Sequence, residues 1–246
     1  MSVALVLSIL LQTICVVHVL RTGRPYWWVW VIIFGSFVGV AVYALTQMLP
    51  DLQNDPRARQ AAKGIAKTIN PERDLRRLRE ELARADTVQN RMRLGAEFLE
   101  LDEPAEAEAV FRECLRGLHA EDPDILLALA QAQFAQDKAQ DTHDTLNHLI
   151  RANPDFKSPE GHLLYARTLQ QLGRDQEALA EYEVLSDSYP GEEARVRKAE
   201  LLRQLGMEGD ARTVLETVLS RSKLAPAFYR KAQREWIHRA KQLLKD

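Results

Sequence analysis

Cysteine and histidine are the residues of this sequence that could act as nucleophiles, proton carriers or metal ligands, but their spacing favours none of these roles. The chain of 246 residues holds two cysteines, Cys15 and Cys114, so neither a disulfide framework nor a Cys-x-x-Cys zinc site can form within it. Among the six histidines, His143 and His148 are five residues apart, which does not place them on one helix face. We expect Cys114 to be a buried packing residue. The alternative is a reactive Cys114 assisted by His119. We therefore predict no catalytic residue, no metal site and no cofactor.

From about residue 88 to 223 the sequence repeats a unit of two predicted helices, which are the elements that would position any binding residue. In the clearest copy, residues 162–190, apolar residues recur at helical spacing, residues 173–175 interrupt them, and a second apolar run continues to Pro190. Four copies carry a small residue in one register, at steps of 35, 36 and 33 residues: Gly95, Ala130, Ala166 and Ala199. A large residue follows in the second helix of each copy: Phe111, Leu146, Tyr182 and Leu215. We expect the small residues to allow close helix approach and the large ones to fill the space between units.

This pattern resembles the tetratricopeptide repeat (TPR), a two-helix unit of about 34 residues. The first copy is the best match, and its residues at the family's positions are Leu94, Gly95, Phe98, Ala107 and Phe111. No copy has the tryptophan of the family pattern, and Thr142 replaces the second-helix alanine of the second copy, which predicts looser packing there. The resemblance implies an all-α fold in which residues 87–223 form four TPR-like repeats of an α-solenoid.

The same resemblance implies that the first helices of the repeats line a concave groove that binds a partner protein or peptide. The predicted groove residues mix apolar, amide and basic side chains: Met92, Leu99, Leu127, Gln131, Phe134, Leu163, Arg167, Gln170, Val196 and Arg203. For each of them, packing between repeats is the alternative role. The lysine and asparagine pattern with which some relatives hold a C-terminal carboxylate is not present. Because residues 87–220 hold 14 basic and 26 acidic side chains, we predict a basic partner segment, extended or helical, with apolar anchors.

The N-terminal residues 1–49 have the composition of two transmembrane helices. Residues 2–20 and 26–49 contain no charged side chain, and the first run lacks the basic start and the cleavage site of a signal peptide. A turn at residues 21–25 would place both termini on one side of the membrane. Aromatic residues at the start of the second run suit a membrane interface: Tyr26, Trp27, Trp28 and Trp30. A buried soluble hairpin is the alternative interpretation.

Gly35 and Gly39 form a Gly-x-x-x-Gly pattern in the second run, which permits close contact between membrane helices. We expect them to pack on a small and polar stripe of the first run rather than to form a dimer; this stripe is Ala4, Ser8, Gln12 and Cys15. The hairpin resembles the N-terminal anchor of phospholipase-D-type cardiolipin synthases. Those enzymes need a His-x-Lys motif that this sequence lacks, so the resemblance implies an anchor without the chemistry.

Location follows from the same two runs and from these resemblances. We predict a protein integral to a membrane, the bacterial inner membrane. Four basic residues follow the second run, at positions 57, 59, 63 and 67, whereas the turn holds Arg21 and Arg24. This balance favours a cytoplasmic repeat domain.

Two helices are predicted to cap the array. Residues 50–86 form a connector and an N-terminal capping helix with an apolar edge at Leu75, Leu78 and Leu82. Residues 224–246 form a basic C-terminal capping helix, whose predicted inner stripe is Tyr229, Ala232, Trp236, Ala240 and Leu243. Its outer side carries the predicted lipid-headgroup contacts Arg230, Arg234, Lys241 and Lys245, or is simply solvated. Nucleic acid is not expected, because no binding motif accompanies the charge.

The predicted function is therefore that of a membrane-anchored TPR scaffold and not of an enzyme. Its groove would hold a partner protein or peptide and so assemble or regulate a complex at the membrane. The alternative is a non-catalytic accessory of phospholipid metabolism that contacts anionic lipid through the hairpin and the basic C-terminal helix.

Overall fold

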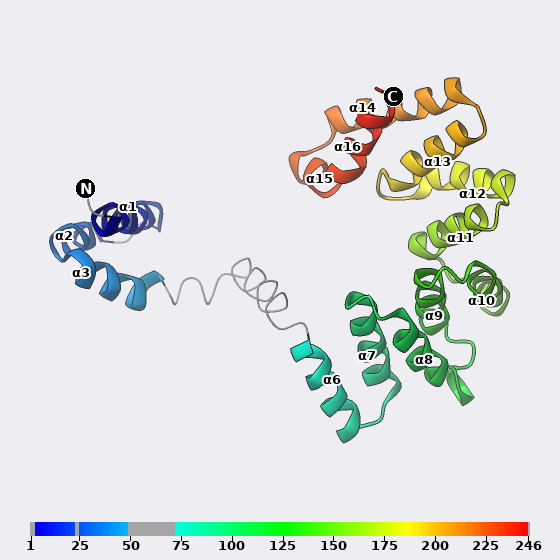
Figure 1. Cartoon of the computed structure of the whole chain (residues 1–246), viewed down its shortest axis with the longest axis horizontal. Coiled ribbons are helices and arrows are strands. Elements are labelled where there is room, and N and C mark those ends of the chain that lie inside the picture. The colour runs from blue at the N-terminus through cyan, green and yellow to red at the C-terminus, as the bar shows by residue number, and fades with distance from the viewer. Residues whose placement is uncertain (1–2, 23–24, 49–71, 246) are drawn as a thin grey trace. The chain divides into compact units, whose positions relative to one another are not determined.

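The computed structural model describes residues 3–22, 25–48 and 72–245, and its regular elements in these ranges are all helices. The chain divides into two compact units, residues 1–73 and 74–246 (Figure 1). Most of the predicted connector, including the basic residues at positions 57–67, lies outside the described residues.

In residues 3–48, as far as they are described, the N-terminal unit forms α1 (Val3–Thr22), α2 (Trp27–Phe34), α3 (Ser36–Tyr43) and a π-helical turn, Ala44–Met48. Their core is formed by Cys15, Val19, Ile32, Val40 and Tyr43. The second predicted span is thus divided at Gly35 instead of forming one continuous helix. Among the helices that the structure describes, none is both long enough and apolar enough to cross a membrane.

Gly35 and Gly39 lie where α3 folds closely against the end of α2. A Cβ added at either glycine would overlap the carbonyl oxygen of Val31, and at Gly39 it would lie 3.5 Å from Cα of Ile32. The nearest neighbour of the glycines is therefore α2, and not the first helix that the sequence predicted. α1 meets the other helices through Cys15 and Val19 in this core, and through Gln12, whose Nε2 donates to the carbonyl oxygen of Ile32 at 3.1 Å.

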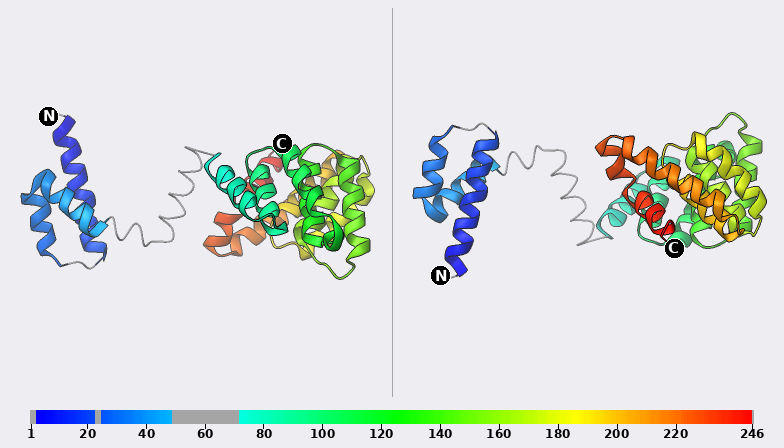
Figure 2. Two further views of the ribbon diagram at one scale, coloured as in Figure 1. Left: turned by 90° about the horizontal axis from the view of Figure 1, so that it is seen from below. Right: turned by 90° about the horizontal axis from the view of Figure 1, so that it is seen from above.

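The second unit is a curved array of four helical hairpins between two capping segments. It begins with α6 (Glu72–Arg84) and continues with the hairpins α7–α8 (Val88–Glu100, Pro104–Cys114), α9–α10 (Pro123–Ala135, Ala139–Ala152), α11–α12 (Pro159–Gln171, Asp175–Ser188) and α13–α14 (Glu193–Gln204, Glu208–Leu224). A 3₁₀ turn, Gly117–His119, joins the first two hairpins. The chain ends with α15 (Ala227–Ala232) and α16 (Arg234–Leu243). The first helices, α7, α9, α11 and α13, lie along the inner side of the curve (Figure 1), and Figure 2 shows the same array turned by 90°.

The turn inside each hairpin has the same backbone conformation. One residue in each turn has a positive φ, between 58° and 77°: Asp102, Asp137, Gly173 and Gly206. After it, the next N–H donates to the carbonyl five residues earlier, as from Glu103 to Phe98 at 2.9 Å and from Met207 to Leu202 at 2.8 Å. This left-handed cap satisfies carbonyls that the helix end leaves unpaired, so each second helix starts in the same direction.

The predicted small and large positions form the core of the array. Ala130, Ala166 and Ala199 are fully buried, and a Cβ added at Gly95 would lie only 2.6 Å from Cζ of Phe111. Thr142 is also fully buried, and its hydroxyl donates to the carbonyl of Lys138 at 2.9 Å. The second repeat is therefore closely packed at Thr142, and the predicted looseness is wrong there.

The ends of the array are covered by the capping segments. Leu75 and Leu78 of α6 pack into the same cluster as Leu94 and Phe98. At the other end the predicted single helix is broken at Gln233, whose side-chain oxygen accepts the N–H of Glu192 at 2.9 Å. Because of this break, a different side of the C-terminal segment faces the array. The buried residues of α16 are Ile237 and the predicted Ala240, while the predicted Ala232 is exposed.

Candidate functional site

The predicted groove residues occupy three different environments. Leu163 and Val196 are 5% and 0% exposed and belong to the cores between helices, so these two do not line an open groove. Four apolar residues are half-buried against the cores: Met92, Leu99, Leu127 and Phe134. The polar residues are the exposed Gln131 and the half-buried Arg167, Gln170 and Arg203. An accessible inner surface thus remains around Phe134 and Arg167.

Arg167 on α11 and Phe134 on α9 meet across two neighbouring repeats. The guanidinium carbon of Arg167 lies 4.6 Å from the centroid of the Phe134 ring, which is a cation–π contact. Desolvation lowers the pKa of Arg167. Among the described residues Arg167 has no hydrogen bond and no ion pair. Its five N–H donors have no acceptor among the described residues and, because Arg167 is only half-buried, they are available to a ligand from the inner surface.

Other polar side chains near Arg167 are already paired. Nε2 of Gln170 donates to Oε1 of Gln204 in the next repeat at 3.2 Å, and its own oxygen accepts from the hydroxyl of Tyr182. Tyr182 is fully buried, and burial raises its pKa to about 12. Arg197 forms an ion pair with Glu193 at 2.7 Å. Unlike Gln170 and Arg197, Arg167 has no hydrogen bond or ion pair among the described residues.

Arg203 marks the C-terminal end of the inner surface. Its guanidinium donates to the carbonyl of Leu243 at 3.1 Å and pairs with Glu208 at 3.2 Å. The ring of Trp236 on α16 lies 5.0 Å from the guanidinium of Arg197. Predicted as a groove residue, Arg203 instead holds α16 in place, and α16 covers the last repeat.

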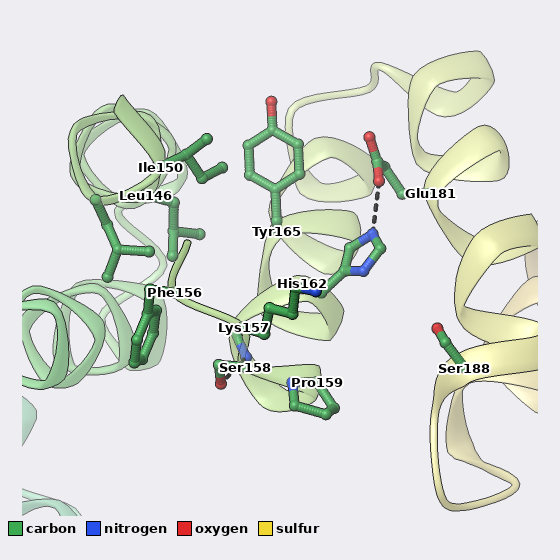
Figure 3. A pocket seen from close by; sticks show the side chains of 12 residues that line it. Leu146, Ile150, Phe156, Lys157, Ser158, Pro159, His162, Tyr165, Glu181 and Ser188 are labelled. Carbon is green, nitrogen blue, oxygen red and sulfur yellow. Dashed lines mark hydrogen bonds and ion pairs between the residues drawn. The ribbon is translucent and has the colours of Figure 1, made fainter. Parts of the chain in front are cut away.

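A separate hollow of about 490 Å³ lies between α10, α11 and α12 (Figure 3). Its apolar wall includes Ile150 and Phe156, and on its polar side His162 Nε2 lies 2.6 Å from Glu181 Oε2. The hydroxyl of Ser158 caps α11 by accepting the N–H of Gly161 at 3.0 Å. Sequence analysis missed this hollow; an aromatic residue in the loop before α11, Phe156, was the available signal.

Cys114 is the buried packing residue that the sequence predicted. It is 2% exposed and lies at the end of α8, and burial raises the pKa of its thiol. His119 faces Asp122 instead, at 3.7 Å. In the part of the chain that the structure describes, no group of three or more histidine, cysteine, aspartate or glutamate side chains could hold a metal ion.

The predicted basic surface gathers around one hollow at the end of the array. Of its four residues, Arg230, Arg234 and Lys241 line a hollow of about 420 Å³, whereas Lys245 does not. Lys223 and His238 also line it, and sequence analysis had not included these two.

No protein-family model matches the sequence, and no curated protein is significantly similar to it. Among solved structures, the chain is similar to MamA, with a TM-score of 0.55 and 18% identity over 69% of this chain and 95% of MamA. It is also similar to a putative kinesin light chain of Podospora anserina with nearly identical TPR-like repeats, with a TM-score of 0.54 and 16% identity over 72% of this chain and 94% of the other. YrrB, described as a TPR protein with an unusual peptide-binding site, gives a TM-score of 0.50 and 17% identity over 72% of this chain and 91% of YrrB. These similarities confirm the predicted all-α, TPR-like solenoid fold.

Proposed function

We propose that this chain is a TPR scaffold whose inner surface binds a segment of a partner protein across α9 and α11. The observation that carries the proposal is the guanidinium of Arg167, which is half-buried, stacked on Phe134 and without an acceptor in the described part of the chain. A ligand carboxylate would provide that acceptor and form a bidentate pair. Two similarities give additional support: the TPR-like fold, and the peptide-binding site described for YrrB.

The chemistry of this surface defines the partner segment. Phe134 and the half-buried Leu127 offer apolar contact, and Arg167 offers a cation. We therefore expect a segment that carries an apolar residue next to an acidic residue. The acidic surplus of the repeats predicted a basic partner; in this proposal it steers the approach of the whole partner, while Arg167 selects the residue that lies at the centre.

In-cell photocrosslinking tests the proposal. The probe residue replaces Gln131, which is exposed on the same helix as Phe134, so that the Phe134–Arg167 contact is kept. Val184, exposed on the outer helix α12, is the control position, and Ile150 reports on the hollow between α10 and α12. We expect one discrete protein adduct from position 131 alone. Adducts from position 150 alone would place the partner in the hollow and contradict the proposal.

A matched pair of substitutions then isolates the charge of Arg167. Arg167→Met keeps a long stem over Phe134 but removes the guanidinium, and we expect it to reduce the adduct at position 131 strongly. Arg197→Met removes an arginine that is already paired with Glu193, so the adduct should persist. Equal losses in both variants would show that general charge, and not the free guanidinium, governs binding.

Membrane anchoring through residues 1–49 is a further part of this proposal, motivated by the two uncharged runs. An anchor would hold the repeats at the membrane and raise the local concentration of the partner. Release of the chain by alkaline carbonate without detergent would rule out anchoring. A reporter fused after Asp246 would test the proposed inner-membrane orientation with cytoplasmic repeats; activity only outside the cytoplasm would overturn it.

A further inference from the structure

The turn between α14 and α15 exposes two large apolar side chains at the end of the array. Leu224, the last residue of α14, is 89% exposed, and Phe228 in α15 is 77% exposed. They are four residues apart in the sequence, and α15 lies at an edge of the second unit (Figure 1). We call residues 223–234 the C-terminal corner.

Hydrogen bonds from Tyr229 and to Gln233 fix the orientation of α15, and with it that of Phe228. The hydroxyl of Tyr229 donates to Oε1 of Glu192 at 2.9 Å, and Gln233 accepts the N–H of the same Glu192. Glu192 is 0% exposed and also pairs with Arg195 at 3.1 Å, so it is a fixed anchor. Because Tyr229 and Gln233 share one face of the segment, Phe228 lies on another and cannot turn inward without breaking these bonds.

The C-terminal corner also has the strongest positive charge of the array. Residues 221–246 hold eight basic and two acidic side chains, the reverse of the balance in residues 87–220. The hollow beside the corner is lined by Lys223, Arg230, Arg234, His238 and Lys241, with no acidic residue among its lining side chains in the described structure. None of its lysines and arginines forms an ion pair within the described residues. In contrast, many basic residues of the repeats are paired, as Lys138 is with Glu108.

We propose that the C-terminal corner binds the surface of a membrane that contains anionic phospholipid. Phe228 and Leu224 enter the interfacial layer, and the basic residues around the hollow contact headgroup phosphates. Exposed aromatic and aliphatic side chains beside lysine and arginine are the combination that interfacial binding requires. A free phosphate would occupy the hollow but leave Phe228 in water, and the phosphates of a nucleic acid would leave Leu224 without an apolar contact. This proposal does not depend on the partner proposed for the inner surface.

A local probe on the full chain tests this contact independently of any N-terminal anchor. Phe228→Cys is labelled with an environment-sensitive apolar fluorophore, and Leu118→Cys, at an exposed position within the acidic repeats, is the matched control. Cys15 and Cys114 are both buried, so labelling is directed to the introduced site. We expect vesicles of phosphatidylcholine with phosphatidylserine to shift the emission at position 228 to the blue, and spin-labelled lipid to quench it. Pure phosphatidylcholine should have much less effect, and position 118 should not respond.

Neutralising the charge completes the test. Arg230→Gln, Arg234→Gln and Lys241→Gln are combined in the labelled chain, and each lost charge should weaken the fluorescence-detected binding about five-fold. Unchanged binding, or equal signals at positions 228 and 118, would overturn the proposal. The proposal would also be overturned if position 228 did not respond to anionic vesicles but did respond to inorganic phosphate, to nucleic acid or to self-association of the chain. Far-ultraviolet circular dichroism checks that the variants remain folded.

Discussion

Replacing Gly95 by alanine introduces a methyl group into space that the Phe111 ring occupies. The added Cβ would lie 2.6 Å from Cζ and 2.9 Å from Cδ1 of that ring. Overpacking of this kind costs about 1–3 kcal/mol, whereas exchanging glycine for alanine within a helix returns up to about 1 kcal/mol. We therefore expect Gly95→Ala to lower the free energy of unfolding by about 1 kcal/mol.

The other repeats indicate how this loss can be reversed. Two of them combine an alanine with a leucine, Ala130 with Leu146 in the second and Ala199 with Leu215 in the fourth. Phe111→Leu alone leaves space beside Gly95 and should cost about 1–2 kcal/mol. In the double variant the new methyl group fills that space, so its loss should be smaller than the sum of the two single losses by at least about 1 kcal/mol.

Urea unfolding followed by circular dichroism measures the four free energies of this cycle. Gly209→Ala is the control, because a Cβ at Gly209, in the first turn of α14, meets no atom within 4 Å. This control should be neutral or slightly stabilising. Additive losses in the double variant, within about 0.5 kcal/mol, would refute the proposed complementarity of Gly95 and Phe111.

Three further perturbations test other parts of the array. Burial opposes ionisation of Glu108, but hydrogen bonds from Lys138 and other donors outweigh it and lower the pKa of Glu108 from 4.5 to about 2. Its contribution to stability is therefore complete above pH 4.5 and lost as the pH falls towards 2, and acid unfolding of Glu108→Gln should show a weaker pH dependence over this window. Asp102→Gly relieves a left-handed residue and should raise the free energy of unfolding in urea by about 0.5–1 kcal/mol; a decrease would contradict the turn geometry. Glu192→Gln leaves the buried Arg195 without its charged partner and should cost about 3 kcal/mol in the same assay, with recovery when Arg195→Met is added.

The repeat positions could be predicted because they are set by local spacing. Where the two helices of a hairpin cross closely, the residue at the crossing must be small, as Gly95 and Ala130 are. The large residues opposite them are buried, as predicted. The same logic failed for Leu163 and Val196, since helical spacing gives the side of a helix but not how deeply the next repeat covers it. Sequence periodicity therefore predicted the array better than its accessible surface.

Features that depend on contacts between distant residues could not be predicted. The predicted C-terminal helix is divided at Gln233, whose side chain accepts the N–H of Glu192, 41 residues earlier. No local sequence pattern signals this bond. The missing acceptor of Arg167 is likewise visible only when the neighbouring repeats are in place. In the N-terminal unit, Gly39 predicted a close approach, but the chain bend at Gly35 determines which helix is approached.

The polar links between repeats have a mechanical consequence. Within each hairpin the left-handed turn is fixed by backbone bonds, whereas neighbouring repeats are joined at the inner surface by side-chain links such as that between Gln170 and Gln204. Each repeat packs mainly on the next, so small rotations at successive joints add up along the array. We therefore expect the array to act as a spring, in which the hairpins move as units, and a segment bound between α9 and α11 to change the curvature of the whole array.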